Sequence, residues 1–126
     1  MIKGVGIDVV EVVRIERAMQ NPRFVVRVLT EREREGRLDA AFVAGRWAAK
    51  EAVAKATGVP MSWQDVEIVN LSDGTPKVVL RQNRKMDDKT MIAPSALFRA
   101  EQIAEEIHIS ISHERGIAAA IAIWEG

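Results

Sequence analysis

The sequence predicts one α+β domain over residues 1–126, with a strand first, several helices after it and a hairpin at the end. A chain of 126 residues can bury one modest hydrophobic core and is too short for two. Apolar residues make up 48% of it and charged residues 29%, the mixture of an ordinary globular protein. Apolar residues recur with a period of about two at both ends of the chain and with helical spacing over much of the middle.

The elements are expected in this order: a strand at 2–10, helices at 11–20, from 22, from 30 and at 39–57, strands at 66–71 and 77–81, a helix at 95–106, and strands at 107–112 and 117–124. Asn21 and Pro22 end the first helix and start the second, because Asn caps a helix and Pro suits its first position. Thr30 and Glu33 fit a capping box, and Gly58 fits the residue that follows the longest helix.

The connections carry turn-forming residues. Residues 72–76, Ser-Asp-Gly-Thr-Pro, predict a tight loop between two strands. Residues 82–94 are polar and irregular, and Ser95 can cap the helix that follows them. Residues 113–116 predict the turn of the last hairpin, whose second strand contains the alanines 118–120 and should pack closely against something bulky.

Composition excludes several classes of site. The absence of cysteine excludes disulfides, thiolate metal sites and cysteine nucleophiles, and two histidines are too few for a multi-histidine zinc site. No apolar run is long enough to cross a bilayer, and the N-terminus enters a strand pattern at once, unlike a signal peptide. We therefore expect a cytoplasmic protein with no membrane partner.

The formal net charge is zero, because 18 lysines and arginines balance 18 acidic residues. A general nucleic-acid binder usually carries a basic excess, so no nucleic-acid partner is expected. Charge can act only in local patches, of which the clearest lies on the first two predicted helices: Arg14, Arg17, Arg23 and Arg27. Scattered arginines are usually solvated surface, whereas a concentrated set would steer an acidic partner.

The long predicted helix carries an unusual pair of charges. At about 100° per residue, Phe42, Ala49 and Val53 share one side of this helix and are expected to meet the core. Glu51 and Lys55 then lie nearly opposite. The simplest interpretation is a solvated ion pair one turn apart, worth a few tenths of a kcal/mol.

Small residues flank Glu51 and Lys55 at positions where a solvent-exposed face normally carries long polar side chains: Ala44, Ala48 and Ala52. Small side chains let another surface or a ligand approach the helix backbone closely. Because structural ion pairs also gather charges, both a functional site and a structural pair stay open at this point.

Asp8 interrupts the apolar run of the first predicted strand, between Ile7 and Val9. Charged residues are seldom buried without a partner, so Asp8 could cap the following helix or bind a metal ion. Two carboxylates, several waters and phosphate oxygens are the usual magnesium shell, and Asp8 with Glu51 would supply the carboxylates. His113, beside the last predicted turn, is a weaker candidate and by itself more often structural.

Three segments match one known family in order and spacing: Gly6-Ile7-Asp8 followed by Arg14-Ile15, Arg46-Trp47-Ala48-Ala49-Lys50-Glu51-Ala52 followed by Lys55-Ala56 and Gly58, and Ile109-Ser110-Ile111-Ser112-His113. The chain resembles the holo-acyl-carrier-protein synthases, the short group of phosphopantetheinyl transferases. The central segment is the most specific, and the resemblance covers most of the chain except 82–94, which we interpret as an insertion. It implies the phosphopantetheinyl-transferase-like fold, an antiparallel sheet packed against one long and several shorter helices.

The resemblance also implies a reaction, the transfer of 4′-phosphopantetheine from coenzyme A to a serine of apo acyl carrier protein in fatty acid biosynthesis. Asp8 and Glu51 would hold Mg²⁺, Lys55 would stabilise the departing 3′,5′-ADP, and Glu51 is the candidate base for the serine. The implied contacts with coenzyme A are Arg46, Lys50, Lys55, Ser112 and His113, and those with the carrier are Arg14, Arg23 and Arg27. The family is typically a homotrimer with active sites between subunits, which would place the alanine-lined helix face near a neighbour.

Two other classes of function stay open. A non-catalytic oligomeric module could dock an acidic helical partner through the arginines, and it would not need Asp8, Glu51 or Lys55. A different magnesium-dependent phosphoryl enzyme, such as a nucleotide hydrolase, is weakened by the absence of a P-loop motif. Weighing apo carrier after incubation with the protein, coenzyme A and magnesium would separate all three.

Overall fold

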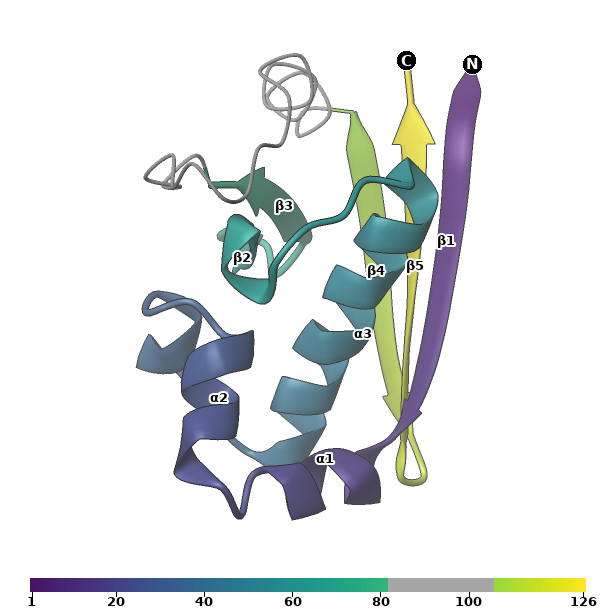
Figure 1. Cartoon of the computed structure of the whole chain (residues 1–126). Helices are drawn as coiled ribbons and strands as arrows, with labels where there is room; N and C mark the ends of the chain where they lie inside the picture. Colours follow the sequence, from purple (N-terminus) through teal and green to yellow (C-terminus); the bar gives the residue numbers. More distant parts are fainter. Residues whose placement is uncertain (82–105) are drawn as a thin grey trace.

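The computed structural model describes residues 1–81 and 106–126 and has the α+β architecture that the sequence predicts (Figure 1). Its elements are β1 (Ile2–Glu11), α1 (Val12–Ala18), α2 (Pro22–Val28), the 3₁₀ turn η1 (Glu33–Glu35), α3 (Ala40–Thr57), the 3₁₀ turn η2 (Trp63–Asp65), β2 (Val66–Asn70), β3 (Pro76–Leu80), β4 (Ile107–Glu114) and β5 (Ile117–Glu125). Among these residues, no helix is long and apolar enough to cross a membrane.

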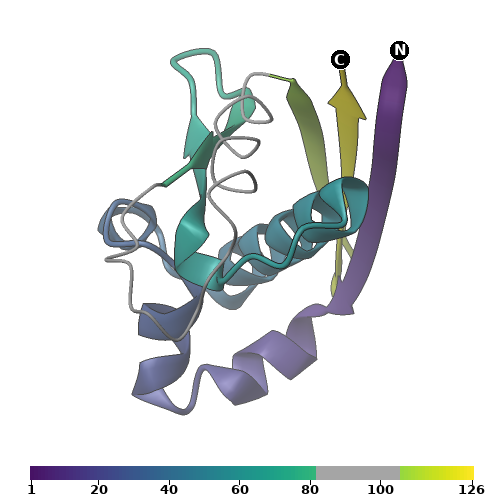
Figure 2. The ribbon, with the colours of Figure 1, turned by 45° about the horizontal axis from the view of Figure 1, so that its top comes forward.

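The strands form two antiparallel groups, a sheet in the order β1-β5-β4 and a separate β2-β3 hairpin. The long helix α3 lies between them, with the sheet on one side and the hairpin on the other (Figures 1 and 2). Successive side chains of a strand alternate between faces, so each strand has one face toward α3 and one away from it. We call these the inner and outer faces of the sheet.

The inner face meets the backbone of α3 at unusually short range. A Cβ atom on Gly6 would lie 1.9 Å from the carbonyl oxygen of Ala52, and one on Gly4 would lie 1.9 Å from that of Ala56. No side chain fits in that space, so β1 can cross α3 only where it carries glycine. β5 contributes the buried alanines Ala118, Ala120 and Ala122 to the same layer.

This packing corrects one sequence-based interpretation. Ala44, Ala48 and Ala52 do admit a closely approaching surface, but that surface belongs to the chain itself, since all three are fully buried within it. A neighbouring subunit is therefore not needed to explain them. Of the residues expected to face the core, Ala49 and Val53 are fully buried and Phe42 is partly buried.

Three of the predicted helix signals are confirmed, and the fourth, the cap at Ser95, lies outside the described residues. Asn21 accepts a hydrogen bond from the N–H of Arg23 at the start of α2, and Gly58 ends α3 in the left-handed region at φ 65°. The Thr30–Glu33 capping box forms with both of its hydrogen bonds, at 2.8 and 3.3 Å, although no α-helix follows it directly, only the 3₁₀ turn η1, whose own N-cap residue is Arg32.

The last hairpin is tighter than predicted. His113 and Glu114 belong to β4, and the turn consists of Arg115 and Gly116 alone, which pass through the left-handed region at φ 48° and φ 78°. A two-residue turn with positive φ at both positions suits the twist of a hairpin but is usually made by Asn-Gly or Asp-Gly, so arginine gave no signal for it. The helix predicted at 95–106 lies almost entirely outside the described residues.

Candidate active site where β1 crosses α3

The candidate site begins with Asp8 on the inner face of β1. Register places Asp8 opposite the buried Ala120, and only 16% of its side chain is exposed. The Nζ atom of Lys55, on α3, lies 3.1 Å from Asp8 Oδ1 and also donates to the carbonyl oxygen of Ile7 at 3.0 Å. Asp8 therefore does not cap α1, whose N-cap residue is Glu11 and has no side-chain cap.

Glu51 precedes Lys55 by one turn of α3 and therefore lies on the same side of the helix. It is half-buried and lines a cavity of about 40 Å³ together with Met61 and Trp63. Within residues 1–81 and 106–126, Glu51 has no hydrogen-bond or ion-pair partner, so the solvated Glu51–Lys55 pair considered from the sequence does not form. Lys55 instead joins the helix to the strand, through Asp8 and the carbonyl oxygen of Ile7.

This donor set fits a magnesium ion in its chemistry. Magnesium prefers hard oxygen ligands and is usually held by one or two carboxylates together with water and substrate phosphates. Asp8 has a hydrogen bond to Lys55 alone and Glu51 has none in the part of the chain that the structure describes, so both retain free lone pairs. No cluster of three or more His, Cys, Asp or Glu side chains occurs in that part, so the remaining ligands would have to be water or phosphate.

The side chain of Lys50 is buried inside the protein, whereas the resemblance implied a contact with coenzyme A. Its side chain is 1% exposed, and its Nζ atom donates to Glu33 Oε1 at 2.6 Å, to the carbonyl oxygen of Val28 at 2.8 Å and to that of Trp63 at 2.9 Å. Burial lowers the pKa of this ammonium, and the Glu33 carboxylate opposes the shift. Because all three donors are used inside the protein, the geometry favours a structural task for Lys50 over contact with coenzyme A.

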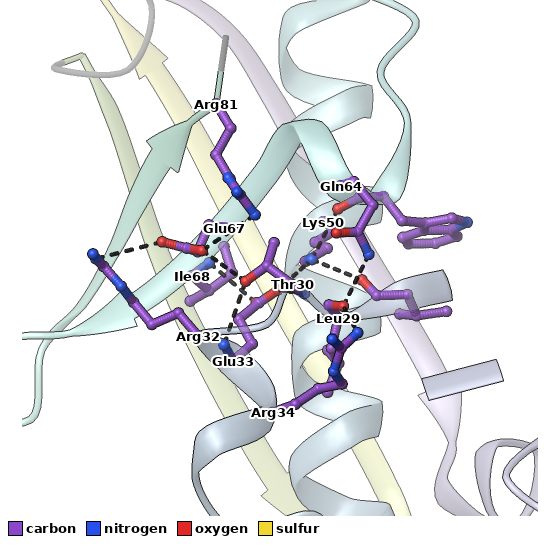
Figure 3. A network of polar contacts seen from close by, with 12 residues as sticks. Leu29, Thr30, Arg32, Glu33, Arg34, Lys50, Gln64, Glu67, Ile68 and Arg81 are labelled. Atoms are coloured by element: carbon purple, nitrogen blue, oxygen red, sulfur yellow. Dashed lines mark hydrogen bonds and ion pairs between the residues drawn. The ribbon is translucent and has the colours of Figure 1, made fainter. Parts of the chain in front are cut away.

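Glu33, which the sequence suggested only as part of a capping box, is the centre of a buried polar network (Figure 3). Its Oε1 accepts from Lys50 and from the N–H of Thr30, and its Oε2 accepts from the N–H of Ile68 at 3.1 Å. Thr30 Oγ1 in turn donates to Glu67 at 2.7 Å, and the arginines 32 and 81 pair with that carboxylate. The network fastens the loop after α2 to both α3 and β2, next to Glu51.

Arg46 also lies mostly inside the protein, with 7% of its surface exposed. Its Nη2 donates to Asn70 Oδ1 at 3.1 Å, its guanidinium lies 4.6 Å from the ring centre of Phe42, and burial lowers its pKa. The buried Nε of Arg46 has no hydrogen-bond partner among the described residues. A ligand can therefore contact only those N–H groups of the Arg46 guanidinium that do not donate to Asn70.

The structure separates two residues that the sequence placed together. Ser112 and His113 are consecutive on β4, so their side chains point to opposite faces of the sheet. Ser112 lies on the outer face, where it lines an open hollow of about 410 Å³ with Glu114 and Arg115. His113 lies on the inner face, against the start of α3 at Gly45, a helical glycine that our sequence analysis did not single out.

The arginine patch consists of exposed residues on the two short helices. Arg14 lies on α1, and Arg23 and Arg27 lie on α2. Exposed apolar side chains accompany them, with Val13 43% and Val26 56% exposed. Phe24 on α2 stacks on Trp47 of α3, which stacks on Trp63, so the patch is fixed to the helix that carries Glu51 and Lys55.

Comparisons with known proteins point to one family. The family model of the 4′-phosphopantetheinyl transferase superfamily matches residues 4–121. A holo-[acyl-carrier-protein] synthase of Listeria monocytogenes is 42% identical over 118 residues, which cover 85% of this chain and 100% of the relative. A holo-(acyl-carrier-protein) synthase of Bacillus anthracis, solved in complex with CoA (3′,5′-ADP), superposes with a TM-score of 0.73 at 33% identity and covers 99% of this chain and 97% of its own. The synthase of Neisseria meningitidis gives a TM-score of 0.80 at 27% identity, with 100% of both chains covered. The chain therefore belongs to the 4′-phosphopantetheinyl transferase superfamily and, within it, to the holo-[acyl-carrier-protein] synthases.

Proposed function

We propose that this chain transfers the 4′-phosphopantetheine group of coenzyme A to a serine of apo acyl carrier protein and releases 3′,5′-ADP, with Asp8, Glu51 and Lys55 at the reacting phosphate. Family membership supports the reaction, since the curated relatives carry the name of this activity and the Bacillus anthracis neighbour was solved with CoA (3′,5′-ADP). The observation that carries the proposed site is the 3.1 Å contact between Asp8 and Lys55, one helical turn from Glu51.

The chemistry needs few protein groups. The serine oxygen forms a bond to the phosphorus that bears pantetheine, the bond from that phosphorus to the bridging oxygen breaks, and 3′,5′-ADP leaves with that oxygen. Glu51 accepts the serine proton, for which its half-buried carboxylate has free lone pairs. Lys55, whose side chain is 53% exposed, can turn from Asp8 toward a phosphate oxygen and stabilise the charge on the leaving group.

Magnesium is the proposed metal, and Asp8 and Glu51 are the residues that would hold it. When bound there it would neutralise charge on the pyrophosphate of coenzyme A. Asp8→Asn and Glu51→Gln keep the shape of each side chain and remove its charge, so each should slow transfer roughly a hundredfold, with the deficit largest at low magnesium. Asp73→Asn, in the exposed β2-β3 turn, is the matched control. Transfer at the control rate by both variants would remove the metal from these residues.

The substrate contacts complete the proposal. Arg46, Ser112 and His113 contact coenzyme A, with Ser112 reaching it from the outer face and His113 from the inner face of β4. Arg14, Arg23 and Arg27 contact the acidic surface of the carrier. Lys50 contributes through the fold, by fixing the neighbourhood of Glu51, rather than by touching coenzyme A.

A homotrimer with sites between subunits is part of the proposal. The outer face of the sheet supports it, because large apolar side chains there are 36 to 60% exposed in the single chain: Val5, Ile7, Val9, Ile117 and Ile121. A contiguous apolar surface of this kind marks an interface. Light scattering should give three times the mass of the chain, and a monomer at working concentration would contradict the trimer. The cytoplasmic location stays a prediction from the sequence.

The proposed reaction has a direct test. Apo carrier, coenzyme A and magnesium are incubated with the protein, and the intact carrier is weighed by mass spectrometry. The carrier should gain one phosphopantetheine while an equal amount of 3′,5′-ADP appears. A well-folded protein that leaves the carrier mass unchanged would contradict the proposed function.

A further inference from the structure

The inner face of β4 packs against α3 at a glycine. A Cβ atom on Gly45 would lie 2.5 Å from His113 Nε2, 3.2 Å from His113 Cε1 and 3.1 Å from Ile111 Cγ2. Glycine weakens the interior of a helix relative to alanine, so helix formation does not explain its presence in α3. The imidazole of His113 occupies the volume that an alanine methyl group would need.

We propose that Gly45 is a positioning residue for coenzyme A binding, because the missing side chain lets the His113 ring lie against α3 in the orientation that meets the nucleotide. This inference rests on the proposed contact between His113 and coenzyme A. Gly45 itself touches no substrate and acts only through His113.

Asp39 caps α3, and its Oδ1 accepts a hydrogen bond from the N–H of Phe42 at 2.9 Å. That hydrogen bond is the main cause of the lowered pKa of Asp39, and the charge of His113 is a minor cause in the same direction.

The clash that Gly45→Ala introduces can be relieved without unfolding. The nearest atom is the far end of a side chain, so the ring can rotate away while the backbones of α3 and β4 stay in place. His113 is an exposed residue, which leaves room for that movement. Alanine also suits a helix better than glycine, so the melting temperature should equal or exceed that of the wild type.

The test compares four proteins: wild type, Gly45→Ala, His113→Ala and the double variant. Gly45→Ala should raise KM for coenzyme A roughly tenfold, the loss expected for one hydrogen bond to a charged group, and leave KM for the carrier unchanged. In the His113→Ala background the same substitution should have no further effect, because no ring remains to be displaced. Gly36→Ala is the matched control, since a Cβ at Gly36 meets nothing within 4 Å.

Nuclear magnetic resonance gives a readout that does not depend on activity. The sequence has two histidines, so His113 can be assigned by its loss in His113→Ala. A nuclear Overhauser effect between its ring and the α-protons of Gly45 should be present in the wild type, and the ring resonances should move in Gly45→Ala while those of His108 do not.

The outcomes separate this inference from the function on which it rests. An unchanged KM for coenzyme A in Gly45→Ala, or an equal rise in the His113→Ala background, overturns the role of Gly45. If His113→Ala itself leaves that KM unchanged, the contact between His113 and the nucleotide is wrong and the inference falls with it, although transfer continues. Only a wild-type protein that fails to modify the carrier overturns the proposed function.

Discussion

Replacing Lys50 by methionine should be among the most damaging changes to the fold, although a lysine on a helix is usually a surface residue. Methionine keeps most of the aliphatic stem and removes the ammonium. The change leaves the carboxylate of Glu33, whose side chain is fully buried, without the one cationic partner that it has within hydrogen-bond distance in residues 1–81 and 106–126. It also leaves the carbonyl oxygens of Val28 and Trp63 without the donor that now joins them.

Breaking a buried ion pair by removing one partner costs about 3 to 5 kcal/mol, because an uncompensated charge stays in the interior. For a chain of 126 residues, that loss corresponds to a fall in melting temperature of roughly 10 to 20 °C. The partner variant Glu33→Gln removes the charge and keeps one oxygen acceptor, which can serve the amide of Thr30 or that of Ile68 but not both, because these amides donate to different carboxylate oxygens. The double variant should therefore lose less than the sum of the two single losses, since it no longer buries an unpaired charge.

Urea denaturation of the four proteins measures the effect and the coupling. Lys55→Met is the matched control, since Lys55 lies on the same helix and makes one half-exposed ion pair, worth less than about 1 kcal/mol. A Lys50→Met midpoint as high as that of Lys55→Met would refute the argument, because it would mean that the Glu33–Lys50 pair contributes no more than a surface pair.

Two further predictions concern acid stability and the carrier surface. The hydrogen bond from the N–H of Phe42 lowers the pKa of Asp39 below 3.8, so its ionised form stabilises the fold above that value, and this contribution is lost as the pH falls through the lowered pKa. Asp39→Asn should therefore lose less stability than the wild type on acidification, and equal losses in urea midpoint would exclude Asp39 as a source. Charge reversal at Arg14 and Arg23 should raise KM for the carrier more than KM for coenzyme A, and salt should slow wild-type association. Lys77→Glu, at an exposed position of β3 rather than on α1 or α2, is the control, and an unchanged carrier KM in both arginine variants would move the docking surface elsewhere.

The fold was predictable where local signals and packing agree. Asp39 accepts from the N–H of Phe42 at the start of α3 and Gly58 ends it, so the longest helix has nearly the bounds that the sequence predicts. The capping box at Thr30 and Glu33 was also visible, because both of its hydrogen bonds join residues three positions apart.

The candidate site was predictable only in part, because its decisive contacts join distant segments. The residues of the Asp8–Lys55 pair are 47 positions apart in the sequence, and those of the Glu33–Lys50 pair are 17 apart. The spacing of apolar residues, from which helices and strands were predicted, does not indicate either pair. Lys50 therefore looked like a ligand contact beside Glu51, whereas the fold turns it toward Glu33. The sequence did contain one unused signal, the glycine at position 45 inside a helix.

Turnover of Lys55→Ala tests the central claim most directly, that the meeting of β1 and α3 is where phosphopantetheine is transferred. The measurement is the transfer rate at saturating coenzyme A and carrier, with folding checked by a thermal melt and coenzyme A binding measured separately. If Lys55 stabilises the departing 3′,5′-ADP, kcat should fall strongly while coenzyme A still binds, because the interaction grows in the transition state. Arginine at this position should restore the rate only partly, since its planar fork cannot place a point charge in the same way. A well-folded Lys55→Ala protein with wild-type turnover would contradict the account and leave the Asp8–Lys55 contact a structural ion pair.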